Sequence, residues 1–405
     1  MAQQHREVPA SAPRFEAIDL LRGLSILSVV LLHCWIRFAL SGVRLGSGLA
    51  PWLRHLLLRN GGNGVTVFFA VSGFLITLTS VRRFHGLSKV QPLRFYRIRF
   101  ARIAPLLLLV LAILSLLHWA SLHFSTFSAW HIRKSIGLPR ALLSALTFHL
   151  NRLEARTGYL PANWDVLWSL SVEEMFYLFF PLVSVAFLAS RSPLRRIGWP
   201  LLFLLAGALL VLGPWARSVW ITTDIGQEKS YLGGMNAIAM GCLAGLLCDK
   251  LAHAPPIRSR WRFAAETIGW VLILWIATWP QWDWLRNINH FLARHDLDDT
   301  VLPLGVCFVM VTTVLRQSNG GGWLTAPVRW FGRYSYEVYL THEFLVILGV
   351  AAYIRWHIGQ PRIWTVAITL LTAPLGWAVA HWFSEPMNRW LRGEKPPAKQ
   401  RTIVA

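Results

Sequence analysis

The sequence predicts an all-α fold that crosses a membrane many times. Two observations lead to this prediction, the amino-acid composition and the pattern of apolar runs. Hydrophobic residues make up 55% of the 405 residues and charged residues only 15%, whereas soluble domains carry about 25% charged residues. Apolar runs recur from one end of the chain to the other, and each is about 20 residues long, enough to cross a hydrocarbon core of roughly 30 Å as a helix. We therefore expect a polytopic helical membrane protein.

The apolar runs predict about ten transmembrane helices. They lie at 17–41, 63–81, 100–124, 164–190, 198–223, 231–250, 263–282, 297–316, 334–356 and 362–385. The apolar stretch 137–150 is too short to cross a bilayer, and we expect it to be re-entrant or interfacial. An even number of spans places both termini on one side of the membrane.

The distribution of Lys and Arg predicts that this side is the cytoplasm. With the N-terminus inside, the cytoplasmic segments hold 24 Lys and Arg and the outer segments 13, and cytoplasmic loops normally carry the excess. We expect a cytoplasmic N-terminal tail (1–16), one membrane domain (17–385) and a basic cytoplasmic tail (386–405). The polar lead before the first apolar run argues against a cleaved signal peptide.

The charge and the cysteines exclude several functions. The net charge of +21 falls in short loops that orient helices and meet lipid headgroups, so no nucleic-acid binding is expected. The four cysteines form no CxxC pair, which predicts neither a disulfide framework nor a metal site.

Ionisable residues inside membrane helices are costly and usually functional, and two of those in the first span are Arg22 and His33. Arg22 and His33 are eleven residues apart, which places them on one helix face about 16 Å apart along the axis. Each also has a structural explanation. Arg22 could anchor the helix at the interface, and the His33 ring could hydrogen-bond a neighbouring helix.

The segment FYRIRFARIAP (95–105) carries three arginines. Arg99 and Arg102 lie on one helix face, and Arg97 lies a turn earlier. Guanidinium groups suit phosphates, which predicts an anion clamp. The alternative is an orienting basic cluster, which we favour for Arg97.

The segment WDVLWSLSVEEMFYLFF (164–180) places two adjacent carboxylates, Glu173 and Glu174, inside a span. Neighbouring residues on a helix point about 100° apart, so we expect only one of them to face the same cavity as His33. By depth alone, Glu173 and His33 are both expected in the outer half of the bilayer.

Six stretches in order resemble one family, the acyltransferase-3 family of bacterial integral-membrane O-acyltransferases. They are IDLLRGLSILSVVLLH (18–33), VTVFFAVSGFLIT (65–77), FYRIRFARIAP (95–105), LWSLSVEEMFYLFFP (167–181), FGRYSYEVYLTHEFLV (331–346) and SEP (384–386). The resemblance implies a ten-helix core in the inner membrane. It also implies transfer of an acyl group, usually acetyl, from acyl-CoA in the cytoplasm to an extracytoplasmic hydroxyl of a carbohydrate or glycolipid acceptor.

Position by position, the resemblance implies that His33 and Arg22 form a functional pair. It also implies that Glu173 is the more constant acid of its motif. Arg99 and Arg102 match family arginines. The chain also departs from the family pattern. Ile98 stands where a second arginine is usual, Met175 replaces a common Gln, and residues 234–237 read Gly-Met-Asn-Ala where R-x-D-A is frequent.

These expectations combine into one arrangement. The acyl-CoA nucleotide would meet Arg99, Arg102 and Arg22, and its pantetheine arm would run along the first helix, past Ser72, to His33. His33 would act as a general base or carry the acyl group itself, and Glu173 would orient its ring. Two residues three apart in the ninth span, Tyr339 and His342, are expected to bound the same cavity.

Two rival functions remain open. A proton-coupled transporter would also bury His, Arg and Glu in its spans, although the sequence shows no repeated halves of the kind many transporters have. An acyltransferase with a non-glycan acceptor, such as a macrolide, fits the same motifs. The sequence leaves the acyl length and the oligomeric state undetermined.

Overall fold

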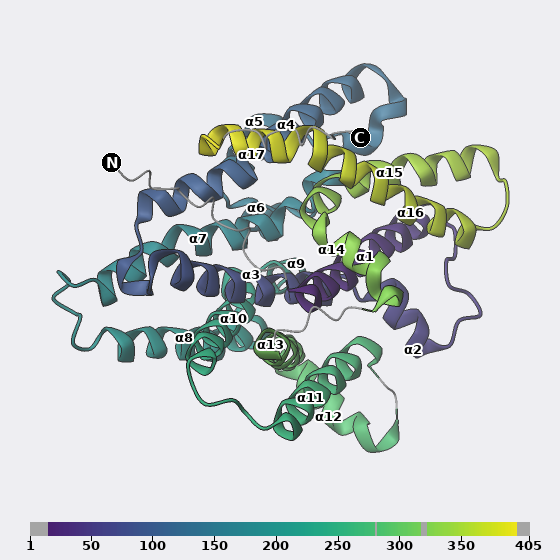
Figure 1. Ribbon diagram of the computed structural model, residues 1–405. Coiled ribbons are helices and arrows are strands. Elements are labelled where there is room, and N and C mark those ends of the chain that lie inside the picture. Colours follow the sequence, from purple (N-terminus) through teal and green to yellow (C-terminus); the bar gives the residue numbers. More distant parts are fainter. Residues whose placement is uncertain (1–14, 280–281, 317–321, 395–405) are drawn as a thin grey trace, which may run out of the picture.

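The computed structural model describes residues 15–279, 282–316 and 322–394, and its regular elements within these ranges are all helical (Figure 1). The α-helices are α1 (Glu16–Leu40), α2 (Pro51–Arg54), α3 (Gly61–Phe84), α4 (Pro92–His123), α5 (Leu138–Leu146), α6 (Leu150–Thr157), α7 (Leu167–Leu188), α8 (Gly198–Trp215), α9 (Asp224–Glu228), α10 (Tyr231–Ala252), α11 (Ser259–Thr278), α12 (Asp283–Arg294), α13 (Asp298–Arg316), α14 (Ala326–Arg333), α15 (Ser335–Trp356), α16 (Pro361–Val379) and α17 (Glu385–Arg392).

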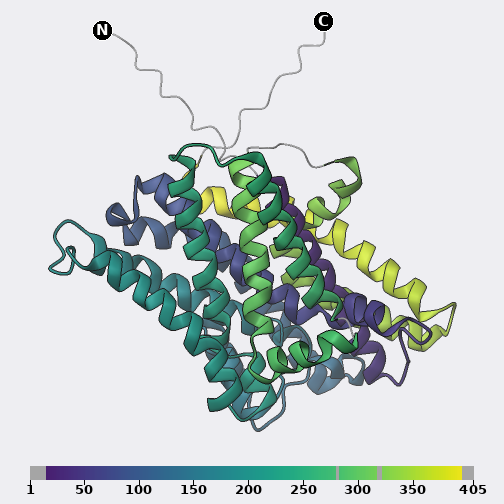
Figure 2. The same ribbon diagram turned by 90° about the horizontal axis from the view of Figure 1, so that it is seen from below.

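Within the described ranges, nine helical segments are long and apolar enough to cross a membrane: those of α1, α3, α4, α7, α8, α10, α13, α15 and α16. The polytopic helical fold is thus confirmed. The remaining predicted span, 263–282, corresponds to α11. This helix is 20 residues long, but Arg260, Arg262 and Glu266 make its first half polar. It packs along α13, and Figure 2 shows α13 between α11 and α10.

The stretch 137–150 does not span the membrane, as predicted. It forms α5, of nine residues, and ends at the first residue of α6, a helix of eight residues. Neither helix is long enough to cross a hydrocarbon core, which takes about 20 residues.

Helix α3 is the central helix of the bundle (Figure 1), and most of its apolar window is buried by α1, α10 and α13. Its contact with α10 depends on glycine. A Cβ atom at Gly73 would lie 2.0 Å from the carbonyl oxygen of Ile238, and one at Gly241 would lie 2.0 Å from that of Ala70. Small residues let membrane helices approach to backbone contact, and this contact fixes the face that α3 turns toward its other neighbours.

Helix α1 packs against α3, α14 and α15. Its close approach to α14 again depends on glycine, because a Cβ at Gly23 or at Gly332 would meet a backbone oxygen at 1.9 or 1.8 Å. With α1 fixed by α14 on one side and by α3 on the other, the face that carries Arg22 and His33 is turned toward the interior of the bundle.

The predicted tail after residue 385 begins as a helix. The chain continues from α16 through a π-helical turn, Ala380–Ser384, into α17, which packs on α4. The guanidinium of Arg97 donates hydrogen bonds to the carbonyl oxygen of Leu391 at 3.3 Å. Residues 395–405 of the tail lie outside the described part.

Candidate active site

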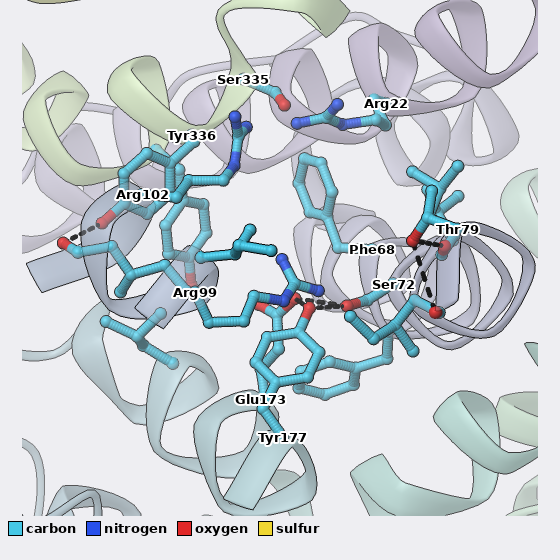
Figure 3. Close-up of a pocket in the computed structure, with 18 of the residues that line it drawn as sticks. Arg22, Phe68, Ser72, Thr79, Arg99, Arg102, Glu173, Tyr177, Ser335 and Tyr336 are labelled. Atoms are coloured by element: carbon cyan, nitrogen blue, oxygen red, sulfur yellow. Dashed lines mark hydrogen bonds between the residues drawn. The ribbon is translucent and has the colours of Figure 1, made fainter. Parts of the chain in front are cut away.

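A cavity of about 430 Å³ lies among α1, α3, α4, α7 and α15 (Figure 3), and we call it the arginine cavity. It brings together six of the residues predicted from the sequence: Arg22, Ser72, Arg99, Arg102, Glu173 and Tyr339. These come from five different helices, so their assembly is a property of the tertiary structure. Ile98, which stands where the family often has arginine, also lines the cavity.

Two further arginines line the cavity that the sequence analysis did not select. Arg83 comes from the last turn of α3 and Arg392 from α17. In the sequence, both lie in basic segments at helix ends, where they are indistinguishable from orienting charges. The packing of α17 on α4 brings Arg392 to the cavity, and the position of α3 brings Arg83.

The five guanidinium groups of the cavity differ in their acidic partners. No carboxylate of the described residues forms an ion pair with Arg22, Arg83, Arg99 or Arg102, whereas Arg392 pairs with Glu394 at 3.2 Å. The Arg99 guanidinium lies 3.8 Å from the centroid of the Tyr177 ring, and its buried Nε finds no hydrogen-bond partner in the described ranges. Arg22 and Arg99 are half-buried, whereas Arg83 and Arg102 are exposed at the cavity mouth. Guanidinium groups without a carboxylate partner can bind a phosphate through two hydrogen bonds, so the cavity is suited to bind an anion.

Glu173 is held by two hydroxyl groups inside the arginine cavity. Ser72 and Tyr177 both donate to its Oε1, and the two hydroxyls also contact each other (Figure 3). Glu174, the next residue, is not among the residues that line the cavity, and its Oε1 is buried without a hydrogen-bond partner among the described residues. The two carboxylates therefore face different surroundings, as their angular separation on a helix requires.

His33 contacts a second histidine. The rings of His33 and His342 lie 4.9 Å apart in an edge-on arrangement, and Nδ1 of His33 lies 3.4 Å from Nε2 of His342. The His342 ring is fully buried, and its Nδ1 lies 2.8 Å from the carbonyl oxygen of Tyr339. A proton on that Nδ1 leaves Nε2 of His342 as an acceptor for His33.

These contacts assign the tautomer of His33. Its Nδ1 lies 2.9 Å from the carbonyl oxygen of Val29 and also faces the acceptor nitrogen of His342, so Nδ1 carries the proton. A neutral imidazole has one protonated nitrogen, and Nε2 of His33 therefore keeps its lone pair. No described residue hydrogen-bonds this Nε2, which leaves it available as a base or a nucleophile.

The structure does not bring Glu173 to His33, which corrects the expected arrangement. The Tyr339 hydroxyl contacts Ser169 at 2.6 Å. Glu173 lies one turn from Ser169 along α7, and His342 lies about one turn from Tyr339 along α15. The two helices run in opposite directions, so helix rise separates Glu173 from His342 by about 10 Å. The residue that contacts the His33 ring is His342, not Glu173.

Tyr339 marks the end of the arginine cavity nearest the histidines. It lines the cavity, whereas neither His33 nor His342 does. Its hydroxyl also donates to the carbonyl oxygen of Val166 at 2.9 Å. The histidine pair therefore lies just beyond the end wall of the cavity.

An ion pair supports the histidine pair. Arg37, one turn after His33, pairs with the buried carboxylate of Glu343, which follows His342. This contact holds α1 and α15 in register at the two rings. Sequence reasoning missed Glu343, although an acidic residue inside an apolar span was a signal that could have found it.

Arg97 does not belong to the site. Its side chain is exposed, does not line the cavity, and binds the backbone of α17. This geometry agrees with the interpretation of Arg97 as part of a basic cluster rather than the anion clamp.

The departure at residues 234–237 has a steric cause. A Cβ at Gly234 would lie 2.7 Å from a methyl group of Val172 and 2.8 Å from the ring of Phe69. Side chains of α3 and α7 fill the space that a longer side chain at residue 234 would need. An arginine, which the family often has here, would not fit beside them.

A family model described as an acyltransferase domain matches residues 15–381, nearly the whole chain. The chain belongs to the acyltransferase-3 family. The chain is similar to several curated proteins, and no solved structure gives a significant match. It is 23% identical over 395 residues to the O-acetyltransferase OatA of Staphylococcus aureus, covering 92% of this chain and 57% of the relative.

Two further relatives have names that specify their acceptor. The peptidoglycan O-acetyltransferase OatA of Listeria monocytogenes is 24% identical over 372 residues, covering 89% of this chain and 54% of the relative. The putative peptidoglycan O-acetyltransferase YrhL of Bacillus subtilis is 24% identical over 407 residues, covering 95% and 56%. The chain thus spans little more than half the length of the curated relatives it matches.

Proposed function

We propose that this acyltransferase is an inner-membrane O-acetyltransferase. It takes an acetyl group from acetyl-CoA on the cytoplasmic side and passes it to a hydroxyl of a glycan on the other side. The observation that carries the donor assignment is a set of four arginines around one cavity that pair with no carboxylate in the described part of the chain. The relatives named for peptidoglycan O-acetylation support a glycan acceptor.

The arginine cavity suits the shape of acetyl-CoA. Arg83 and Val65, which both line it, are eighteen residues apart on α3, or about 27 Å of helix rise. The nucleotide phosphates would bind the guanidinium groups at the Arg83 end, and the slender pantetheine arm would extend toward Tyr339. Arginine binds phosphate through two parallel hydrogen bonds, which also orient it. The thioester would then lie one turn from the histidine pair.

The chemistry needs a group that can take a proton from the acceptor hydroxyl, and Nε2 of His33 has the required lone pair. As the proton moves to His33, the acceptor oxygen bonds to the acetyl carbon, the carbon–sulfur bond breaks, and coenzyme A leaves as a thiolate that takes up the proton. General-base catalysis of this kind typically contributes about 10²–10⁴-fold. If His33 instead carries the acetyl group, the same lone pair makes the bond.

The test is acetyl transfer by the purified protein from labelled acetyl-CoA. We expect the wild-type protein to consume acetyl-CoA and to be stabilised against heat by coenzyme A. His33→Ala should abolish the turnover and keep the thermal shift, because His33 lies beyond the end of the donor cavity. A wild-type protein that neither consumes acetyl-CoA nor shifts with coenzyme A would contradict the proposal and favour a transporter.

A further inference from the structure

A second cavity, of about 390 Å³, lies among α3, α7, α13 and the ends of α8 and α11. We call it the aspartate cavity. The residues that matter for its chemistry are Asn63, Thr66, Trp168, Arg217, Asp298 and Asp299. Its volume falls within the range of about 300–1,000 Å³ that small-molecule sites occupy, and none of these residues was selected from the sequence.

The two cavities lie toward opposite ends of α3. The arginine cavity is lined by Thr79 and Arg83 near the end of the helix, and the aspartate cavity by Gly62 and Asn63 at its start. Arg83 and Gly62 are separated by about 31 Å of helix rise, which matches the thickness of a hydrocarbon core. Phe69, near the middle, is the only described residue that lines both cavities.

The aspartate cavity lies at a similar level of the bundle to the histidine pair, because Gly61 at the start of α3 packs on Leu32, the residue before His33. Arg59, on its rim, has its guanidinium 5.5 Å from the ring centroid of Trp35, two residues beyond His33 on α1. On the other side, Trp168 precedes Ser169, whose hydroxyl contacts Tyr339 near His342. A molecule bound in this cavity therefore lies away from the donor arginines, on the side of Trp168 that leads through Ser169 and Tyr339 to His342.

A fixed network of polar groups forms one wall. Asp299 pairs with Arg217 and accepts a hydrogen bond from the Thr66 hydroxyl at 3.0 Å. The Arg217 guanidinium lies directly over Gly233, where a Cβ would come within 2.0 Å of its Nε. The network is thus held by three helices and a π-helical turn, and no side chain at residue 233 could be larger than hydrogen without displacing it.

Other groups in the cavity have hydrogen-bonding capacity to spare. The Asp298 carboxylate has no side-chain partner among the described residues, and Asn63 uses only its amide nitrogen, toward Asn60. Trp168 packs edge-on against Phe69 at 6.1 Å. Carboxylate and amide oxygens accept hydrogen bonds from hydroxyl groups, and indole rings supply flat apolar surface. A sugar has both kinds of surface.

We propose that the aspartate cavity is the acceptor site and that it binds a sugar residue whose free hydroxyl receives the acetyl group. This inference rests on the proposed function. It goes further by assigning the acceptor to a particular cavity, with Asn63 and Asp298 as the side chains that hold the sugar.

The experiment measures binding of a fluorescently labelled chitotetraose, a soluble tetramer of N-acetylglucosamine, to the purified full chain. Asn63→Ala and Asp298→Asn should each weaken binding about tenfold, as expected for the loss of a hydrogen bond between a buried site and its ligand. The KM for chitotetraose as acceptor should rise by the same factor, and the thermal shift with coenzyme A should not change. Asn287→Ala, an exposed residue of α12 outside the cavity, is the matched control.

A second measurement needs no substitution. Chitotetraose should slow amide hydrogen exchange at the start of α3, around 62–66, in the wild-type protein. Unchanged exchange there, or variants with unchanged binding and KM, would overturn the acceptor assignment. So would acetyl transfer to a protein acceptor and not to chitotetraose. Failure of the proposed function would be a different result: the wild-type protein would not consume acetyl-CoA, whether or not it binds the sugar.

Discussion

His342 contacts the ring of His33 through Nε2, 3.4 Å from Nδ1 of His33, and this contact decides which nitrogen of His33 can react. Because Nδ1 of His342 faces the backbone at Tyr339, its Nε2 can only accept. His33 must then donate from Nδ1, and its Nε2 is left with the lone pair. His342 is therefore a positioning residue for the proposed base.

Replacing His342 should slow catalysis without weakening donor binding. We expect His342→Ala to lower kcat by about 10²-fold, the lower end of the contribution of a positioned base, because the His33 ring loses the acceptor that fixes its tautomer. The KM for acetyl-CoA should stay within twofold. His342→Gln, whose side-chain oxygen can accept the same hydrogen bond, should restore part of kcat. A purely structural role would instead lower kcat equally in both variants.

Removing a cavity arginine should act on the donor. Arg99→Gln should raise the KM for acetyl-CoA by about tenfold to a hundredfold, since a hydrogen bond to a charged group contributes about 1.5–3 kcal/mol. Its kcat should change little. Arg94→Gln is the matched control, because Arg94 lies on the same helix but is exposed and does not line the cavity. Equal effects of the two substitutions on KM would argue against a specific anion site.

The buried cluster of Lys229, Glu154 and Asp165 should be essential for stability. The Lys229 ammonium pairs with both carboxylates, and the side chains of Lys229 and Glu154 are fully buried. Lys229→Met leaves two carboxylates uncompensated, and breaking a buried pair costs about 3–5 kcal/mol. The melting temperature in detergent should fall clearly. Lys250→Met, an exposed lysine at the end of α10, should leave it unchanged.

The defect of Lys229→Met should depend on pH. Burial, with Asp165 nearby, raises the pKa of Glu154 above its ordinary value. Without the lysine, Glu154 can relieve the unpaired charge by taking up a proton, which is easier at low pH. The melting temperature of the variant should therefore approach that of the wild type as the pH falls from 8 to 5. An equal loss of melting temperature at pH 8 and at pH 5 would contradict this account.

His55, on the rim of the aspartate cavity, should make folding sensitive to acid. Burial and the nearby Arg59 lower the pKa of His55 from its ordinary value of 6.5. The unfolded chain then binds a proton more readily than the folded one, so stability is lost as the pH falls through 6.5 and below. Between pH 7 and pH 5, the melting temperature of the wild-type protein should fall further than that of His55→Gln. Parallel pH profiles of the two proteins would contradict the assignment.

The sequence by itself determined the helical membrane fold, because hydrocarbon requires every backbone group to be satisfied within the chain. The apolar runs therefore located the helices to within a few residues for α1, α10 and α13. The apolar runs did not locate the start of α4. This helix begins at Pro92 rather than near residue 100, because a helix continues into the interface where hydropathy no longer marks it.

The sequence also selected Arg22, Arg99, Arg102, Ser72 and Glu173, which share one cavity. Each is a polar residue at a helix position where burial has a cost, so a functional explanation could be sought from the sequence. Arg83 and Arg392 escaped selection because a basic residue at a helix end is ordinary, and only the packing of α17 against α4 brings Arg392 into the cavity.

Only the tertiary structure decided which polar groups meet. The lateral packing of helices fixes this, and single-helix periodicity carries no information about it. The predicted depth in the bilayer put Glu173 at the level of His33. In the structure, α7 packs against α3 so that Glu173 contacts Ser72, and the register of α15 against α1 brings His342 to His33. The aspartate cavity likewise exists only where α3, α7 and α13 converge, so no single stretch of sequence could have revealed it.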